Sequence, residues 1–336
     1  MTALLELQDV TVHLPVGDEP RTVLRGISLE VAQGEAVGLV GESGSGKSMT
    51  ARAIMRLLPK GARLDGSIRF DGRAVTELDR AGLRAYRGKE VAMVFQDARV
   101  HVNPVRTIGD FMTERVRIEE GVPDATARSR AIELLEEVRV SDAARRLHQY
   151  PHELSGGLLQ RVMIASTLMT SPRLLLADEP TTALDVTTQG EVMAILDELR
   201  RERGMAMLFI THDLELAAAV CDRTAVMYAG EIVEDQPSEA LDTRPRHPYT
   251  AGLIRSRPSV RTTSARLAAI PGRPLSAFEA PEGCSFAPRC AYCEPACTAA
   301  PPALQALAEG RVACRRAEEL ADLLHADVTA ELELPR

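Results

Sequence analysis

The chain has 336 residues, a formal net charge of −8, and a composition that is 45% hydrophobic and 26% charged. That length allows one large domain with a smaller one, or two domains, and the negative charge argues against a nucleic acid as the main partner. The N-terminus lacks the basic segment of a secretion signal, and no apolar run reaches the ~18 residues that a membrane span needs, so we expect a protein of a reducing compartment.

The first hundred residues predict strands that lead into an α/β core. Residues 4–13 and 23–31 alternate between apolar and polar side chains, which is typical of two strands separated by a polar turn. The short apolar run 35–40 predicts a strand, and residues 48–58 have helical spacing that stops at Pro59. Further strands are expected at 66–73 and 91–95.

The remaining chain divides into three stretches of different character. Residues 107–170 are charged and helically periodic, which indicates a helical insertion. Strand-like segments resume at 173–177, 205–210 and 223–234, with a helix at 188–203, and such alternation predicts an α/β fold. Beyond about residue 256 the chain becomes rich in Pro, Ala and Cys. We therefore expect one domain over 1–255 and an extension over 256–336.

A phosphate-binding loop is predicted between the strand at 35–40 and the helix that follows it. The stretch GESGSGKS fits the pattern G-x-x-x-x-G-K-[ST] at every position. Its glycines let backbone N–H groups face a phosphate chain, Lys47 can neutralise the β and γ phosphates, and the Ser48 hydroxyl can bind Mg²⁺. The predicted nucleotide-binding residues are Gly41, Glu42, Ser43, Gly44, Ser45, Gly46, Lys47, Ser48 and Met49.

An acidic pair follows the apolar strand LLLA. Asp178 at the strand end can hold Mg²⁺ beside Ser48, and Glu179 is then placed to activate a water for attack on the γ-phosphate. Such a pair alone is often a plain loop, but about 130 residues after a complete phosphate loop it indicates hydrolysis.

A second anion site is predicted where the stretch ELSGG begins a helix. Ser155 is the expected N-cap, and Gly156 and Gly157 leave the N–H groups of the first turn exposed beside the positive end of the helix dipole. In isolation this is an ordinary capped helix. Because one phosphate loop already serves one triphosphate, we expect this second site to serve the nucleotide of a neighbouring subunit.

The order of these motifs resembles the ATPase subunit of ABC transporters. The phosphate loop is followed by Gln96 after a strand, then LSGG, then the acidic pair, then ALD at 183–185, and then His212 after another strand. The resemblance implies that Gln96 contacts Mg²⁺ or the attacking water and relays to membrane subunits. It also implies that Asp185 lies across a dimer interface and that His212 holds the γ-phosphate and Glu179.

The resemblance narrows to the ATPases of oligopeptide, dipeptide and nickel importers. It is carried by YPHELSGG, ADEPTTALDVTTQ, VMYAGEIVE, RPRHPYTAGLI and IPGRP…GCSFAPRC, over residues 4 to 316. It implies a P-loop α/β core with an N-terminal antiparallel β element, a helical subdomain and a cysteine-rich extension. It further implies ATP hydrolysis for peptide import on the cytoplasmic face of a bacterial inner membrane. The implied partners are a second ATPase subunit, two permease subunits and an extracytoplasmic substrate-binding protein.

Two departures from the family pattern bear on nucleotide contacts. Members of the family usually have an aromatic residue near position 14 that stacks on adenine, whereas this chain has His13 and Leu14. Leu158 stands in the signature where many ABC proteins have Gln. Because the phosphate contact comes mainly from the preceding serine and glycines, we expect activity to survive.

The family resemblance also supplies cysteines at Cys284, Cys290, Cys297 and Cys314, with Cys293 as an extra one. Clustered cysteines in a reducing compartment more often bind metal than form disulfides. The intervals of five, six and sixteen residues lack the close pairs of structural zinc sites, which favours a [4Fe–4S] cluster over Zn²⁺. Free buried thiols are the third interpretation, and for Cys221, on a predicted helix, a core position is expected.

Two other functions stay open alongside peptide or nickel import. One is an ABC ATPase of DNA repair or translation, although such proteins usually carry a long coiled coil or two ATPase halves. The other is an iron–sulfur regulatory protein, against which Glu179 and His212 argue.

Overall fold

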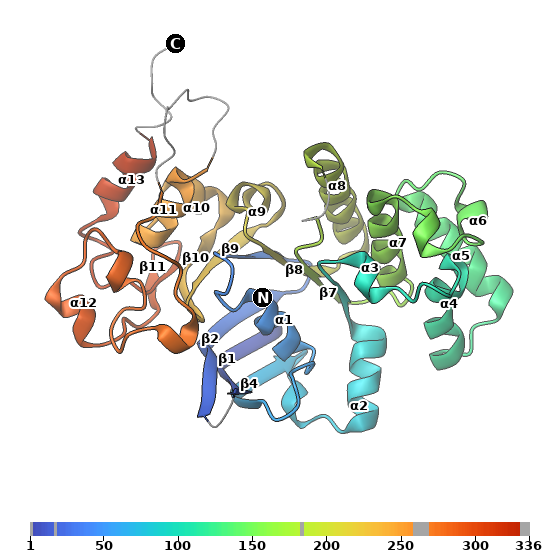
Figure 1. The fold of residues 1–336 in the computed structure, drawn as a ribbon, viewed down its shortest axis with the longest axis horizontal. Helices are drawn as coiled ribbons and strands as arrows, with labels where there is room; N and C mark the ends of the chain where they lie inside the picture. Colours follow the sequence, from blue (N-terminus) through green and yellow to red (C-terminus); the bar gives the residue numbers. More distant parts are fainter. Residues whose placement is uncertain (1–2, 17–18, 182–184, 258–268, 330–336) are drawn as a thin grey trace, which may run out of the picture. The chain divides into compact units, whose positions relative to one another are not determined.

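The computed structural model describes residues 3–16, 19–181, 185–257 and 269–329, without the side chains of 186, 187 and 329. The chain divides into two compact units. One consists of residues 32–35 and 77–209, and the other of residues 3–31, 36–76 and 210–336. Figure 1 shows the elements that form each unit.

The second unit contains an antiparallel β element at its N-terminus. Its strand order is β2-β1-β4-β5. β1 pairs antiparallel with β4, with Leu5 opposite Phe70. The alternating strand pattern expected for the N-terminal residues is confirmed, because Leu5, Leu7, Val10 and Val12 of β1 are all buried. The strands are β1 (Ala3–Val16), β2 (Glu19–Ala32), β4 (Arg63–Phe70) and β5 (Arg73–Ala74).

Strands of a second sheet in the same unit carry the phosphate loop, which follows β3, and include two strands of the extension, β11 and β12. The strand order is β11-β12-β10-β9-β3, and β3 runs parallel to β9. The strands are β3 (Ala36–Val40), β9 (Arg223–Tyr228), β10 (Glu231–Pro237), β11 (Gln305–Leu307) and β12 (Gly310–Val312). The accompanying helices are α1 (Lys47–Ile54), α9 (Leu214–Val220), α10 (Ser238–Thr243), α11 (Pro248–Arg255), α12 (Pro295–Ala299) and α13 (Ala321–Thr329). Short 3₁₀ turns lie at η1 (Val75–Glu77), η4 (Ala277–Glu279) and η5 (Ala287–Arg289).

The expected single strand-like segment at 223–234 is a hairpin. β9 and β10 pair antiparallel with Tyr228 opposite Glu231. The two residues between them, Ala229 and Gly230, both have positive φ, of 45° and 80°. Two successive left-handed residues make the tight turn that matches the twist of the strands. The chain therefore reverses where its apolar pattern looked continuous.

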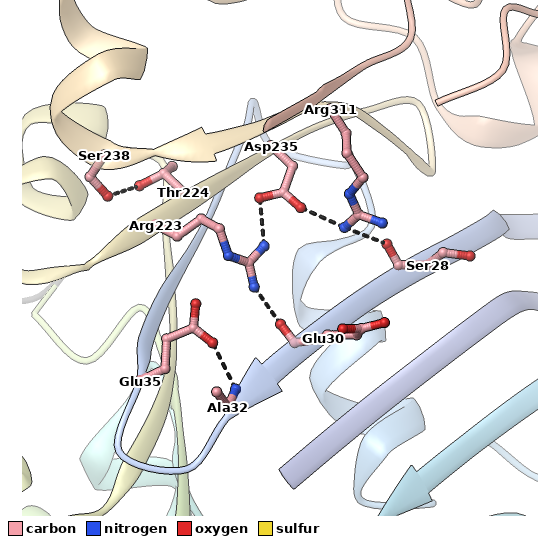
Figure 2. Close-up of polar contacts among 9 residues, drawn as sticks. All are labelled: Ser28, Glu30, Ala32, Glu35, Arg223, Thr224, Asp235, Ser238 and Arg311. Carbon is pink, nitrogen blue, oxygen red and sulfur yellow. Dashed lines mark hydrogen bonds and ion pairs between the residues drawn. The ribbon is translucent and has the colours of Figure 1, made fainter. Parts of the chain in front are cut away.

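The extension is tied to the sheet by a buried carboxylate on β10. Figure 2 shows Asp235 between two guanidinium groups, Arg223 from β9 at 2.6 Å and Arg311 from β12 at 2.5 Å. Arg223 and Arg311 also donate to the backbone carbonyl groups of Glu30 and Ser28 on β2. Asp235 is 2% exposed, and the two guanidinium groups offset the cost of burying its carboxylate. Its two ion pairs hold β12 beside β10.

The first unit holds three core strands and the helical insertion. Its strand order is β8-β7-β6, and β6 runs parallel to β7 with Val91 opposite Leu174. The strands are β6 (Val91–Val94), β7 (Leu174–Asp178) and β8 (Ala206–Thr211), of which the last two residues of β8 are counted with the other unit. The helices are α2 (Arg80–Ala85), η2 (Tyr86–Glu90), α3 (Ala98–His101), α4 (Ile108–Glu119), α5 (Asp124–Glu137), α6 (Ala143–Arg146), η3 (Pro151–Glu153), α7 (Gly156–Leu168) and α8 (Val186–Arg203).

The helical insertion expected at 107–170 is confirmed, since this segment forms α4 to α7. α5 packs on both α4 and α7. Cys221 is buried, as expected, at the end of α9. The boundary between residues 255 and 256 stays a prediction. Among the helices that the structure describes, none has the length and apolar character to cross a bilayer.

Candidate functional site

The phosphate loop connects β3 to α1 and has the backbone that its glycines allow. Gly44 and Gly46 have φ of 82° and 108°, in the region that side chains disfavour. At Gly41 a Cβ atom would lie 2.2 Å from the carbonyl oxygen of Met227, so only glycine fits. The loop is thus packed closely against β9.

The start of α1 has no side-chain cap. Gly46 is the N-cap and has no side chain to accept from the first turn. Lys47 is 5% exposed, and its Nζ donates to the carbonyl oxygens of Gly41 at 2.7 Å and Glu42 at 3.1 Å. A buried ammonium, uncapped N–H groups and the positive end of a helix dipole together suit a phosphate chain. Ser48 and Met49 follow on α1 and are partly buried.

In the first unit, Gln96 forms a hydrogen bond with Glu179, the predicted base. Asp178 ends β7 and is 6% exposed. Glu179 follows with φ of 45°, an unusual conformation for a non-glycine residue and one that clusters at functional sites. Gln96, after β6, donates a hydrogen bond of 2.8 Å from Nε2 to Oε2 of Glu179. The parallel pairing of β6 with β7 places both residues at the same end of the strands.

The signature residues form an exposed helix start. Ser155 is the N-cap of α7, and its side chain accepts from the backbone N–H of Leu158 at 3.4 Å. Ser155 and Gly156 are exposed and Gly157 is half-buried. Space is open around the Gly156 Cα, since an added Cβ would meet no atom within 4 Å. The N-terminal end of α7 is therefore accessible to a molecule from outside.

Asp185 and His212 both stand at the ends of elements. Asp185 is the N-cap of α8 and accepts from the backbone N–H of Thr188 at 3.0 Å and from its hydroxyl at 2.7 Å. His212 follows β8 in the second unit and is exposed. Ala183 and Leu184 of the ALD motif lie outside the described residues.

His13 already has polar partners. Its Nδ1 lies 3.0 Å from the Thr22 hydroxyl, and its Nε2 lies 3.5 Å from a carboxylate oxygen of Asp65. These contacts orient the ring on the N-terminal β element. Stacking of adenine on His13 would have to be compatible with that orientation.

The cysteines of the extension line one small cavity. Cys284, Cys290, Cys293, Cys297 and Cys314 all contribute to it, together with the apolar side chains of Phe286 and Leu320. The backbone N–H of Cys284 donates to the Cys297 carbonyl at 2.8 Å, which draws the two ends of the loop together. Burial raises the pKa of the Cys290 and Cys314 thiols to about 11 each.

Soft thiol donors that converge on one cavity fit a zinc ion or an iron–sulfur cluster chemically. The side chains are nevertheless not assembled as ligands. In the part of the chain that the structure describes, no three His, Cys, Asp or Glu side chains are grouped so as to hold a metal ion.

Two residues that contact the phosphate loop were missed from the sequence. Arg289, from the extension, forms an ion pair with Glu42 at 2.6 Å. Tyr249, on α11, accepts a hydrogen bond of 2.9 Å at its hydroxyl oxygen from the backbone N–H of Glu42. Both residues lie in stretches that carry the family resemblance, HPYT and CSFAPRC, but nothing in those stretches points to a loop more than 200 residues earlier.

Comparison with protein families finds two matches along the chain. Residues 24–182 match the ABC transporter family, and residues 233–297 match the C-terminal region of oligopeptide/dipeptide transporters. The first match covers the phosphate loop, the signature and the acidic pair. The second covers β10, α11 and three of the four expected cysteine ligands.

Similar proteins extend these matches over nearly the whole chain. The oligopeptide transport ATP-binding protein OppD of Salmonella typhimurium is 41% identical over 94% of this chain and 95% of its own length. The dipeptide transport ATP-binding protein DppD of Escherichia coli is 44% identical over 92% of this chain and 95% of its own.

Solved structures agree on the fold. The ATP-binding cassette MJ0796, solved as a dimer in a post-hydrolysis state with ADP and Pi, is 29% identical, with a TM-score of 0.63 over 70% of this chain and 98% of its own. The fold of cbiO1 from Clostridium perfringens is also similar, with a TM-score of 0.62 over 72% of this chain and 91% of its own at 24% identity. The expected P-loop α/β architecture is confirmed. The chain is an ATPase that uses ATP and Mg²⁺, and it belongs to the ABC transporter family, in the group of the oligopeptide and dipeptide transport ATP-binding proteins.

Proposed function

We propose that this chain hydrolyses ATP to power the import of oligopeptides or dipeptides across a bacterial inner membrane. The observation that carries the proposal is the match of residues 233–297 to the C-terminal region of peptide transporters, in a chain 41% identical to a transport protein over nearly its whole length. Import of nickel or another small solute is the alternative, because the ATPase subunit does not contact the cargo. A non-transport ABC ATPase is disfavoured by the same C-terminal match.

In this proposal the residues of the two units have distinct parts in hydrolysis. Lys47 and the loop N–H groups bind the β and γ phosphates, and Ser48, Gln96 and Asp178 hold Mg²⁺ directly or through water. Glu179 accepts the proton of the attacking water, and His212 holds the γ-phosphate in place. The 2.8 Å hydrogen bond from Gln96 supports the assignment of Glu179, since it orients the carboxylate that would act as base.

We assign the helix start at Ser155, Gly156 and Gly157 to the nucleotide of a second ATPase subunit, with Asp185 at the same interface. The exposure of Ser155 and Gly156 supports this assignment, because a site for the chain's own nucleotide would not need to face outward. A similar but distinct subunit is the expected partner.

A permease subunit would dock on the first unit. A groove of about 870 Å³ there is lined by the apolar side chains of Phe95, Phe111 and Ile118 and by several arginines. Ile118 is 67% exposed and Val105 nearby in sequence is 78% exposed. Glu114 and Glu119 also line the groove, but its arginines outnumber them, which suits a short amphipathic segment that carries acidic residues. Gln96 directly follows Phe95, so a segment bound in this groove would adjoin the catalytic glutamine. The protein would then be peripheral at the cytoplasmic face of the membrane, with an extracytoplasmic binding protein that delivers cargo.

The cysteine cavity is the proposed metal site. Cys284, Cys290, Cys297 and Cys314 would ligate one [4Fe–4S] cluster, or one Zn²⁺ as the alternative. The shared cavity supports the proposal, while the thiols would have to lose their protons and draw closer on binding. The metal would contribute structure by closing a segment with few apolar residues.

Steady ATP hydrolysis, measured with and without the permease subunits, tests the transport proposal. We expect hydrolysis to depend on, or to rise several-fold with, the permease and the loaded binding protein. Full activity of the chain alone, unchanged by the membrane subunits, would instead indicate a non-transport ATPase. Stimulation by nickel and not by peptides would favour the alternative cargo.

A further inference from the structure

The extension contacts the phosphate loop through one bidentate ion pair. Arg289 lies at the end of η5, between Cys284 and Cys290. Its Nη1 donates to Oε2 of Glu42 at 2.6 Å, and its Nη2 donates to Oε1 at 3.2 Å. Two parallel N–H···O bonds between charged groups are stronger and more directional than a single contact. Both residues belong to the second compact unit.

Contacts other than Glu42 also fix the position of the Arg289 guanidinium. Its Nε donates to the backbone carbonyl of Pro271 at 2.8 Å. Its Cζ lies 5.7 Å from the ring centre of Tyr228 and 6.0 Å from that of Phe286. The side chain is only 4% exposed, whereas surface ion pairs are exposed and contribute little. This pair is therefore built into the fold.

Glu42 in turn shapes the loop that follows it. Its carbonyl oxygen accepts from the backbone N–H of Ser45 at 3.2 Å and from Nζ of Lys47 at 3.1 Å. Its own N–H donates to the hydroxyl oxygen of Tyr249. A residue held at its side chain, its N–H and its carbonyl has little freedom left. Moving Glu42 would displace both the loop N–H groups and the lysine that face the phosphates.

We propose that Arg289 is a positioning residue for MgATP, because it holds Glu42 and with it the binding conformation of residues 41–48. The inference rests on the proposed assignment of those residues as the phosphate site. The extension would then contribute to nucleotide binding through Arg289. Since Arg289 directly precedes Cys290, it also gives the cysteine cavity a direct structural route to the phosphate loop.

The test is the dissociation constant for MgATP, measured by titration calorimetry on the full chain. We expect Arg289→Gln to raise it about tenfold, as loss of a buried charge-assisted pair would. Glu42→Gln should raise it similarly, and the double variant should be no worse than either single one. Arg289→Lys, which keeps the charge but not the fork, should recover part of the affinity.

The matched control is Arg273→Gln. Arg273 lies in the same extension and makes a bidentate pair with Glu279, another residue of the extension, at 2.6 and 3.0 Å. It should leave the affinity within twofold. Thermal unfolding of every variant shows whether it is folded, and a purely structural role would lower the unfolding temperature without changing the dissociation constant.

Three outcomes would count against the inference, and they are distinguishable. If Lys47→Ala weakens binding but Arg289→Gln does not, the phosphate site stands and Arg289 has no part in it. If Lys47→Ala binds MgATP as the natural chain does, the assignment of the phosphate site fails and the inference fails with it. Additive losses in the double variant would also count against a shared route through the pair.

Discussion

The side-chain amide of Gln96 donates a hydrogen bond of 2.8 Å to the carboxylate of Glu179, although 83 residues separate them in sequence. The contact joins the end of β6 to the end of β7 within one compact unit. Gln96 follows Phe95, which lines the groove proposed for a permease segment, and it directly contacts the predicted base. If a permease segment binds there, Gln96 offers a route to the Glu179 carboxylate.

Replacing Glu179 by Gln should separate ATP binding from hydrolysis. The amide has almost the same size but cannot accept the proton of the attacking water, so turnover should fall ~100-fold or more. The dissociation constant for MgATP should stay within a few-fold. Phosphate release by the purified transporter complex checks this. Glu198→Gln is the control, because Glu198 is an exposed carboxylate of the same unit that pairs with Arg139. Normal hydrolysis by the Glu179 variant would remove it from the role of base.

Replacing Lys47 by Ala should weaken nucleotide binding itself. The buried ammonium of Lys47 is the positive charge nearest the loop carbonyls, and its loss leaves the β and γ phosphates without their counterion. We expect the dissociation constant for MgATP to rise by roughly two orders of magnitude, measured by calorimetry. Lys60→Ala, at an exposed lysine outside the loop, should bind as the natural chain does.

The cysteine cavity predicts a bound metal in protein that is purified without oxygen. A [4Fe–4S] cluster would give a brown protein with a broad absorbance near ~400 nm and about four irons per chain. Replacing Cys284, Cys290, Cys297 or Cys314 by Ser should bleach it, while Cys293→Ser should keep the colour. Stoichiometric zinc without iron would establish the alternative metal. Protein free of any metal would leave buried thiols as the correct interpretation.

Glu234 should make the stability of the second unit depend on pH. It lies wholly buried on β10, where burial raises its pKa to about 7 despite hydrogen bonds from the backbone N–H groups of Arg246 and His247 and from the Gln236 amide. A carboxyl with a raised folded-state pKa contributes stability that is present below about pH 4.5 and is lost as pH rises through about 7. The loss is at most about 3 kcal/mol, from a shift of some 2.5 pKa units.

The glutamine of Glu234→Gln cannot titrate. The unfolding temperature of this variant minus that of the natural chain should therefore rise from pH 5 to pH 7.5. Thermal unfolding at a series of pH values measures this difference. Glu309→Gln, at an exposed carboxylate paired with Arg244, serves as the control and should give a nearly constant difference. An equally constant difference for the Glu234 variant would show that its pKa is not raised.

The strand, loop and helix that form the predicted phosphate site were readable from the sequence because they depend on local chemistry. A phosphate loop needs glycines, a lysine and a serine at fixed spacing between a strand and a helix, and this pattern is readable at Gly41 to Ser48. The same holds for the N-cap Ser155, whose side chain accepts from the N–H group three residues later. Such features depend on neighbours in sequence.

The extension was less readable because distant partners determine its structure. β12 is only three residues long, and it is a strand because Val312 pairs with Glu234 and Arg311 reaches Asp235. Helix α13 lies in a stretch without a readable motif, and it is stabilised where Leu320, Leu324 and Val328 pack on Ala251 of α11. Likewise, the contact of Arg289 with the phosphate loop depends on Glu42, which lies 247 residues earlier.

Uptake of labelled peptide into proteoliposomes tests directly whether this chain powers peptide import. The vesicles would contain this chain, its partner ATPase and the two permease subunits, with the binding protein outside and MgATP inside. We expect di- or oligopeptide to accumulate in the vesicles only when ATP is present, and we expect no accumulation with Glu179→Gln. Vesicles that hydrolyse ATP at a normal rate but accumulate no peptide would contradict it.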